Sequence, residues 1–380
     1  MVEGPVLGTE LQDVQRILVV AYGHTADTLP AGPCLAALRN AYSDANIELL
    51  VLTDVAEFWS SCPHIDGIRV MRDFRHKGTR FARVEQLWAM TLLGLRLRGK
   101  YDLVLVLHAG SWPFSYLAYV TGARYRAGLR GRFPARWLTH APEPAGGTIS
   151  FREENRQVLA SIGVPVRDPH LSYWPTVSAK IEVDRVMPHG SRPVVALHPG
   201  SHWACQRWHN ERWATVADAI VERYGAQIVI TGSADEVALA DDIAAHMRHF
   251  PVIAAGRTSL PAFFDLVARC DLMVCVNSAA SQVALATGTP VVNLVGLESL
   301  AWTAPEVGEP MTVVRESTEP PGPWCPLGIW GRVSGCQIED HVALAGLDPI
   351  LPVHVLRAIS DYLEPAGAQH QWSSDRMGAG

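Results

Sequence analysis

Short apolar runs alternate with longer amphipathic stretches along both halves of the chain. Apolar runs of about four to eight residues are typical of strands buried in a parallel sheet, and the amphipathic stretches are typical of helices that cover it. In the first half the pattern predicts strands at residues 17–20, 47–52, 68–71, 103–107 and 125–128. In the second half it predicts strands at residues 194–197, 227–231, 252–254, 272–276, 291–295 and 311–314. The sequence therefore predicts an α/β protein.

The alternation occurs twice, which indicates two Rossmann-like domains, each with a parallel sheet. A chain of 380 residues is also longer than one hydrophobic core usually supports. We expect an N-terminal domain at residues 1–175, a C-terminal domain at 193–350, a helix at 351–363 and a disordered tail at 364–380, with the proline-containing segment 171–192 as the interdomain linker. Expected helices include residues 83–97, 211–224, 235–247, 260–269 and 278–287. Loops at the carboxyl ends of the strands then line a cleft between the domains.

Two strand–loop–helix junctions in the second half carry polar residues where a buried strand ends. The first is VVALHPGSHWACQRWHNERW at residues 194–213, and the second is MVCVNSAASQVALATGTPVVNLVG at residues 273–296. Such a junction directs backbone N–H groups and the positive end of a helix at one place, which suits a phosphate. Together the two junctions suggest a site for a nucleotide diphosphate.

The composition excludes several classes of protein. With 48% apolar and 18% charged residues, the chain is globular in type. Its longest apolar stretch, residues 87–97, contains Arg96 and is shorter than the roughly 20 residues that span a bilayer. The N-terminal residues hold no basic cluster ahead of an apolar run, so we expect no secretory signal and a cytoplasmic location.

The seven cysteines are an odd number without a Cys-x-x-Cys pair, and several lie within apolar strands. This usage is typical of reduced, buried thiols rather than of a disulfide framework or a zinc site. Cys325 and Cys336, in a segment rich in Gly and Pro, are the alternative pair that could hold a ligand.

Charge is unevenly distributed along the chain. Residues 1–190 hold 21 Lys and Arg against 18 Asp and Glu, a net of +3, whereas residues 191–380 hold 11 against 20, a net of −9. The arginines form two runs, one that includes Arg75 and Arg80 and one that includes Arg130. These runs are either a solvated surface or a site for an anionic acceptor, with at most peripheral membrane contact. A sequence pI of about 6.2 argues against nucleic acid as a partner.

Three motifs resemble those of glycosyltransferase family 9, which contains the lipopolysaccharide heptosyltransferases. They are ILVVAYGHTADTLPAGPCLAALRNAYSDANIELLV near the N-terminus, LHPGSHWACQRWHNERWATVADAI, and VNSAASQVALATGTPVVNLVG. They occur in the order and at the spacing of the family, and the resemblance runs over about residues 17–363. It implies the GT-B fold, in which two Rossmann-like domains face each other across a cleft.

In the first motif, Gly23 and Asp27 lie at positions that match the family. The resemblance implies that Asp27 is the general base that removes the proton from an acceptor hydroxyl, and a carboxylate within hydrogen-bond reach is suited to that step. Two alternatives remain open. Asp27 could instead cap a helix that begins near Thr28, and His24 is a rival base on the same loop.

The resemblance places the donor on the second and third motifs. Gly200 and Ser201 form the turn that meets the diphosphate, and Gln206 stands where relatives have a lysine, with Arg207 beside it as the nearby cation. In the third motif, relatives have Asp, Ser or Thr, Gly, Pro, any residue and His at the positions that are residues 277–282 here. The expected donor contacts at these positions are Asn277, Ser278, Ala279 and Gln282, of which Asn277, Ala279 and Gln282 depart from the family pattern. Loss of a lysine weakens attraction for phosphate and loss of an acid removes repulsion, so the changes oppose each other.

Further donor contacts implied by the resemblance follow other strands: Thr231, Gly232, Ser233, Asp235 or Glu236, Thr258 and Ser259. An acid in this set is expected to meet the ribose. Asp235 could equally be an acid that the dipole favours at a helix N-terminus. The family holds its diphosphate without a metal, so we expect neither a metal nor another cofactor.

The resemblance predicts an inverting glycosyltransferase that moves a heptose or hexose from a nucleotide diphosphate to an acceptor hydroxyl. The expected partners are the nucleotide-sugar donor and a glycan or natural-product acceptor, as in lipopolysaccharide or antibiotic biosynthesis. The alternatives are a sugar-nucleotide epimerase of the same fold and a non-catalytic sugar-nucleotide binding protein.

Overall fold

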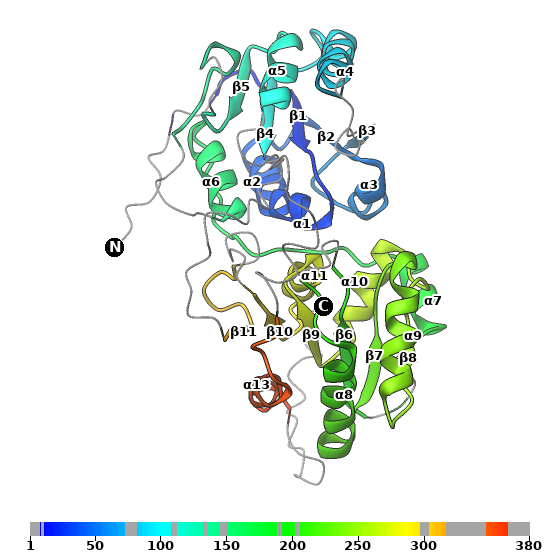
Figure 1. The fold of residues 1–380 in the computed structure, drawn as a ribbon. Helices are drawn as coiled ribbons and strands as arrows, with labels where there is room; N and C mark the ends of the chain where they lie inside the picture. The colour runs from blue at the N-terminus through cyan, green and yellow to red at the C-terminus, as the bar shows by residue number, and fades with distance from the viewer. Residues whose placement is uncertain are drawn as a thin grey trace.

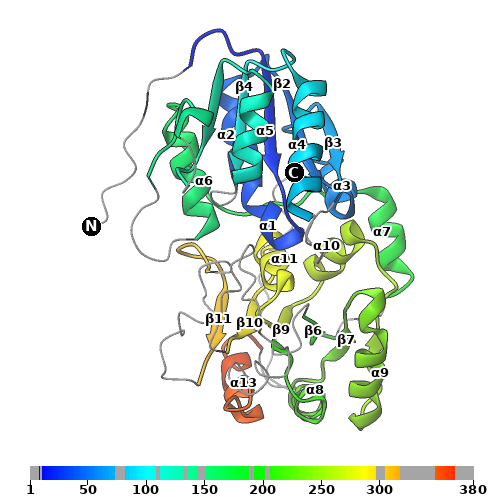
Figure 2. The same ribbon diagram turned by 45° about the horizontal axis from the view of Figure 1, so that its top comes forward.

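The computed structural model describes residues 8, 11–72, 82–107, 112–131, 135–143, 150–187, 190, 192–201, 206–296, 304–316 and 347–363. The chain forms two lobes, and each contains a parallel sheet with helices on both faces (Figures 1 and 2). The expected tail at residues 364–380 lies outside the described residues.

The N-terminal lobe is built on a five-stranded sheet in the order β3-β2-β1-β4-β5. Its strands are β1 (Arg16–Ala21), β2 (Asn46–Leu52), β3 (Gly67–Met71), β4 (Leu103–Leu107) and β5 (Tyr125–Gly128). The helical segments are α1 (Thr25–Thr28), η1 (Leu29–Ala31), α2 (Gly32–Ala41), α3 (Thr53–Trp59), α4 (Ala82–Leu97), α5 (Trp112–Val120), η2 (Ala135–Trp137) and α6 (Phe151–Ala160). Every residue of β4 is buried because helices cover both faces of the sheet.

The C-terminal lobe is built on a six-stranded sheet in the order β11-β10-β9-β6-β7-β8. Its strands are β6 (Val194–His198), β7 (Gln227–Ile230), β8 (Val252–Ile253), β9 (Leu272–Val276), β10 (Val291–Leu294) and β11 (Met311–Val314). The helical segments are α8 (Asn210–Tyr224), η4 (Ala234–Glu236), α9 (Val237–His246), α10 (Leu260–Ala268), α11 (Ala279–Thr287) and α13 (Pro352–Ile359). The strand order reverses between β6 and β9, and in such sheets ligands bind outside the carboxyl ends of the strands at the point of reversal.

The strands predicted from the apolar pattern are all present, and their ends differ from the prediction by one residue at most. The helix predicted at residues 235–247 is divided into η4 and α9. The segment expected to be the linker contains a helix, α7 (Val177–Asp184), which packs against α10 of the C-terminal lobe. Pro175 is compatible with this helix because it precedes the N-cap Thr176, whose hydroxyl accepts from the backbone N–H of Ala179.

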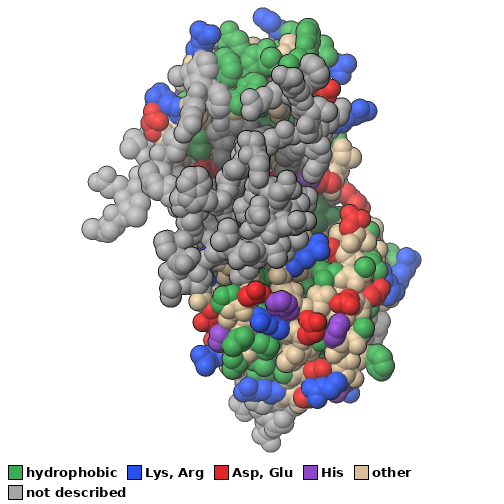
Figure 3. Space-filling view, in the orientation of Figure 1, with side chains coloured by type: hydrophobic (Ala, Val, Ile, Leu, Met, Phe, Trp, Pro, Cys, Tyr) green, Lys and Arg blue, Asp and Glu red, His purple; other side chains and the backbone are tan. Residues whose placement is uncertain are grey.

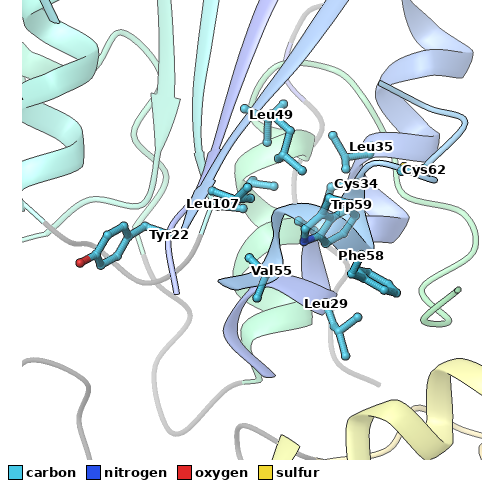
Figure 4. Close-up of a cluster of buried hydrophobic side chains, with 14 of the residues drawn as sticks. Tyr22, Leu29, Cys34, Leu35, Leu49, Val55, Phe58, Trp59, Cys62 and Leu107 are labelled. Carbon is cyan, nitrogen blue, oxygen red and sulfur yellow. The ribbon is translucent and has the colours of Figure 1, made fainter. Parts of the chain in front are cut away.

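The two lobes are joined by an apolar contact as well as by the chain. Phe58 of α3 stacks on Phe264 of α10, with 4.3 Å between the ring centroids. Figure 4 shows Leu29 and Phe58 on the side of the N-terminal cluster that faces a yellow helix of the C-terminal lobe. One connected cluster of buried side chains therefore extends from the N-terminal sheet into the C-terminal lobe.

The cysteines within the described residues are free and buried: Cys34, Cys62, Cys270 and Cys275. Burial raises the pKa of the Cys34 thiol to about 12, so this thiol is inert at neutral pH. Cys205 and the alternative pair Cys325 and Cys336 lie outside the described residues. Among the helices described, none combines the length and apolar character that crossing a membrane requires.

Candidate functional site

The carboxyl ends of β6 and β9 lie side by side at the point where the strand order reverses. His198, the last residue of β6, is in register with Cys275 of β9. The loop that begins at Pro199 is therefore adjacent to the loop at Asn277 and Ser278, although the two are far apart in the sequence. The structure brings together the two junctions that the sequence predicts to form one site.

Residues 199–201 and 206, which are described in the loop after β6, are buried, and a hydrogen bond joins Ser201 to Gln206 within the loop. The hydroxyl of Ser201 donates to Oε1 of Gln206 at 2.6 Å, and both side chains are buried. The exposed Arg207 donates from Nη2 to the Ser201 carbonyl at 3.4 Å. Gln206, where relatives have a lysine, thus supports the turn at Gly200 and Ser201 by a neutral hydrogen bond.

The helix that follows this loop does not begin at the turn. α8 starts at Asn210, and its first turn is held by the segment after residue 346, because Arg212 donates to the carbonyls of Asp348 and Ile350. Trp208 also donates to the Ile350 carbonyl, at 2.9 Å. These contacts anchor the start of α8 to the segment at residues 348–350, and the role of this helix end at the phosphate site stays a prediction.

α11 supplies the helix N-terminus at the site. Ser278 is its N-cap, and the serine hydroxyl accepts from the backbone N–H of Ala280. Asn277 is buried, and its Oδ1 accepts from Nδ2 of the fully buried Asn293 at 3.3 Å. Ala279 is half-buried in the first turn, and Gln282, one turn further, is buried.

Glu236 and Asp235, the two acids predicted to contact the ribose, differ in position. A Cβ added to Gly200 would overlap the Glu236 carboxylate, so Glu236 lies directly against the turn after β6. Its Oε2 accepts from the backbone N–H of Ser233 at 2.7 Å and from the Ser233 hydroxyl at 2.9 Å. Asp235 is exposed. Glu236 is therefore the acid that reaches the loop after β6, while Gly232 lies beneath it.

His198 is a residue of this region that sequence reasoning missed. Its Nδ1 lies 3.0 Å from the hydroxyl of Thr231, which also donates to the Leu197 carbonyl. Burial lowers the pKa of His198, and the nearby Glu236 carboxylate opposes that shift in part. Burial thus favours the uncharged form of the ring, which joins β6 to β7 beside the turn.

Ser259 makes hydrogen bonds that connect two helices, α7 and α10. It is the N-cap of α10, and its backbone N–H and hydroxyl both donate to the Glu182 carboxylate of α7, the latter at 2.9 Å. Thr258, the residue before it, is half-buried. Ser259 thus holds α7 to α10, which is a structural role besides any contact with the donor.

In the N-terminal lobe, the loop after β1 leads directly into α1. The N-cap of α1 is His24, so the helix begins three residues earlier than the alternative of a cap by Asp27 requires. Asp27 accepts from the backbone N–H of His24 at 2.9 Å and is half-buried. Gly23, with φ of +155°, packs so closely on Asp27 that an added Cβ would collide with it.

Asp54, which sequence reasoning also missed, completes this cluster. It lies in the first turn of α3, at the carboxyl end of β2, and its Oδ2 is 2.5 Å from Nδ1 of His24. β1 and β2 are adjacent parallel strands, so their carboxyl ends place the two loops together. An acid after β2 in the same sheet is the sequence signal that could have indicated this contact.

The two halves of the site meet across the lobes. α1, which carries Asp27, contacts α11, whose N-cap is Ser278. Both ribbon views show α1 next to α11 (Figures 1 and 2). The helix that carries the Asp27 carboxylate therefore packs against the helix whose N-terminus belongs to the other half of the site, and a base and a site for an anionic leaving group are the groups that such a pairing of helices can bring to one cleft.

Of the three arginines predicted to contact the acceptor, Arg130 lies within the described residues. Arg130 follows β5 and pairs with Glu143 at 2.6 Å, with both side chains exposed. The guanidinium of Arg130 is therefore already paired with a carboxylate of the same lobe, and its contact with an acceptor stays a prediction. Arg75 and Arg80 lie outside the described residues.

Comparison with known proteins matches residues 90–323 to the family described as glycosyltransferase family 9 (heptosyltransferase). Lipopolysaccharide heptosyltransferase 3 of Escherichia coli is 27% identical over 282 residues, which cover 71% of this chain and 80% of that protein.

Solved structures of family members have the same fold. The family 9 glycosyl transferase of Veillonella parvula aligns with a TM-score of 0.75 at 20% identity, over 92% of this chain and 97% of that one. The E. coli ADP-heptose LPS heptosyltransferase II aligns with a TM-score of 0.69 at 19% identity, over 92% and 98%. The predicted GT-B architecture is thereby confirmed.

Proposed function

This chain belongs to glycosyltransferase family 9, and we propose that it transfers a heptose or hexose, with inversion, from a nucleotide diphosphate to a hydroxyl of a lipopolysaccharide-type glycan. Two similar proteins support the choice of substrates, since their names assign them heptose transfer on lipopolysaccharide. The contact between α1 and α11 supports the mechanism, because α1 carries Asp27 and Ser278 is the N-cap of α11.

The donor diphosphate lies at the reversal of the second sheet. Backbone N–H groups at the start of α11 meet its charge, and the turn at Gly200 and Ser201 forms the other wall. The net charge of −9 on residues 191–380 repels a diphosphate at long range. Screening over about 8 Å at physiological salt reduces that repulsion, so the oriented dipoles at short range decide binding. Glu236 accepts from a ribose hydroxyl beside Gly200.

Asp27 acts as the general base. It takes the proton of the acceptor hydroxyl while the acceptor oxygen bonds to the anomeric carbon and the bond from that carbon to the diphosphate breaks. The negative charge that develops on the diphosphate is stabilised by the N-terminus of α11. Attack from the side opposite the leaving group inverts the anomeric centre. His24, positioned by Asp54, lies beside the acceptor and orients its hydroxyl.

Calorimetric titration with ADP, GDP, UDP and TDP tests the donor site. We expect one nucleotide diphosphate to bind in preference to the other three, and absence of binding by all four at millimolar concentration contradicts the proposal. Mass spectrometry of a core glycan incubated with the matching nucleotide sugar then tests transfer. Conversion of the nucleotide sugar without any acceptor would favour an epimerase, and binding without either reaction would favour a non-catalytic binding protein.

A further inference from the structure

α4 is apolar on the face that it buries and also on the face that it exposes. Met90 and Leu97 are buried against the lobe. The opposite face exposes apolar side chains at intervals of three and four residues: Val84, Leu87, Trp88, Leu92 and Leu95. Trp88 is 63% exposed and Leu92 is 50% exposed. We call these five side chains the outer face of α4.

Apolar side chains on one continuous helical stripe are costly to leave in water, and such stripes mark interaction sites. In Figure 3 hydrophobic side chains gather at the top of the N-terminal lobe, over α4 and α5. The two helices are in close contact, because a Cβ added to Gly94 of α4 would overlap the side chain of Val120. The outer face is therefore part of a well-packed layer and presents a fixed surface.

Cations follow the outer face at the C-terminal end of the helix. Arg96, Arg98 and Lys100 are exposed, and residues 86–101 contain no acid. The described acid of the helix, Glu85, lies in its first turn, at the opposite end. A partner that covers the outer face and also neutralises these cations must be apolar and negatively charged.

α4 also begins at the cleft side of its lobe. It follows β3 in a parallel sheet, so its first turn lies near the carboxyl edge, from which α1 and α3 reach the C-terminal lobe. Sixteen residues of helix extend roughly 24 Å. The outer face thus extends from the cleft side of the lobe toward its far end.

We propose that the outer face of α4 docks the protein on an anionic lipid bilayer, with the helix lying in the plane of the interface. Trp88 and the leucines enter the boundary between headgroups and acyl chains, which is where tryptophan is favoured. Arg96, Arg98 and Lys100 meet anionic headgroups. A second copy of the same face would offer the same cations rather than the anions that they require. This surface is separate from the proposed catalytic site, and its docking does not depend on the reaction.

Flotation of the full-length chain with vesicles tests the proposal, using phosphatidylcholine alone or mixed with phosphatidylglycerol. We expect the wild type to float with the mixed vesicles. The triple variant Trp88→Ser/Leu92→Ser/Leu95→Ser should lower its partition coefficient at least tenfold. The variant Arg96→Gln/Lys100→Gln should lower it by about fivefold per residue, because each cation near an anionic surface contributes about that factor.

The matched control is Val177→Ser/Ile181→Ser, which removes two exposed apolar side chains of α7 and should float as the wild type does. Equal thermal unfolding midpoints would show that the variants are folded. A wild type that floats with neither vesicle, or a triple variant that floats as well as the wild type, overturns the proposal. A wild-type dimer that the triple variant converts to a monomer, without vesicle binding, would assign the face to a second copy instead.

An assay with a soluble, deacylated acceptor separates this proposal from that of the reaction. The triple variant should retain wild-type transfer to the soluble acceptor while losing vesicle binding. Failure of the wild type to transfer any sugar, with vesicle binding intact, would count against the reaction alone.

Discussion

Oδ2 of Asp54 lies 2.5 Å from Nδ1 of His24, and this contact connects the loop after β1 to the first turn of α3. Each residue stands at the carboxyl end of a strand, and the strands are adjacent. The contact fixes the imidazole ring beside Asp27, which accepts from the backbone N–H of the same histidine. Asp27, His24 and Asp54 therefore form one connected cluster in the N-terminal lobe, and substitution of each residue can separate their roles.

Asp27→Asn should lower kcat by about 100-fold or more, because a general base typically contributes that factor. The amide oxygen can still accept from the backbone N–H of His24, so α1 should remain capped. We expect the Kd for the nucleotide diphosphate, measured by calorimetry, to stay within a factor of about two, since the charge change is outside the donor pocket. Unimpaired turnover would refute the assignment of Asp27 as the base.

Asp54→Asn should have a smaller effect, because Asp54 is a positioning residue with a half-exposed side chain. Exposed ion pairs contribute about 1 kcal/mol or less, which corresponds to at most about fivefold in kcat/KM. In a His24→Gln background the same substitution should have no further effect. Measurement of kcat/KM for the two single variants and the double variant checks this, and additive losses would contradict a shared role.

Gly200→Ala should weaken donor binding. A Cβ at this position overlaps the Glu236 carboxylate, which would have to leave its hydrogen bonds with Ser233. Overpacking of this kind costs about 1–3 kcal/mol, which corresponds to about fivefold or more in Kd. Gly232→Ala is the matched control, because its Cβ would approach Glu236 only to 3.1 Å and should have a milder effect. Calorimetry with the preferred nucleotide compares the two, and equal losses would argue against the proposed contact.

Arg152→Met should destabilise the protein by breaking a buried ion pair between the two lobes, which we call the joint. Arg152 of α6 pairs with Glu309, just before β11, at 2.6 Å, and both side chains are 3% exposed. Removing one partner of a buried pair costs about 3–5 kcal/mol because the other charge stays buried. Urea unfolding should show this loss, and Arg152→Met/Glu309→Met should recover most of it.

The exposed pair of Arg130 and Glu143 is the control for this joint. Arg130→Gln should change the free energy of unfolding by less than about 1 kcal/mol, because water already solvates both groups. A buried-pair variant that is no less stable than Arg130→Gln would show that the joint contributes little.

Asp218 should make stability depend on acid pH. Burial alone would raise the pKa of Asp218, but donation from the backbone N–H groups of Arg248 and His249 and from the Arg248 guanidinium outweighs it, so the pKa is lowered. The folded state then binds fewer protons than the unfolded state, and the stabilisation is complete above the unfolded pKa of about 3.9. It is lost as the pH falls through that value toward the lower folded pKa.

Asp218→Asn should therefore destabilise the protein by about 1–3 kcal/mol at neutral pH, since it removes a charged acceptor from buried donors. The variant should lose less stability than the wild type on acidification below about pH 4.5. Urea unfolding at several pH values measures both effects. Asp241→Asn, which changes an exposed carboxylate on α9, should follow the wild-type curve.

The strands and most helices could be predicted because their signals are local. The apolar run at residues 272–276 is followed at once by Asn277 and Ser278, and β9 and the N-cap of α11 lie there. Burial of the strand and capping of the helix depend on neighbouring residues in the chain, which the amino-acid order already states. The family motifs are also continuous segments of the chain, so they indicate approximately where the site lies.

The folded chain alone assigned several roles that local patterns leave open. Glu236 rather than Asp235 reaches Gly200, Asp54 contacts His24, and Arg212 in the first turn of α8 donates to the Asp348 carbonyl. Each outcome joins side chains that are distant in the sequence or selects between neighbours of the same type. The order of strands in the sheets and the direction of each side chain decide such contacts, and neither quantity is encoded in the period or propensity of any one segment.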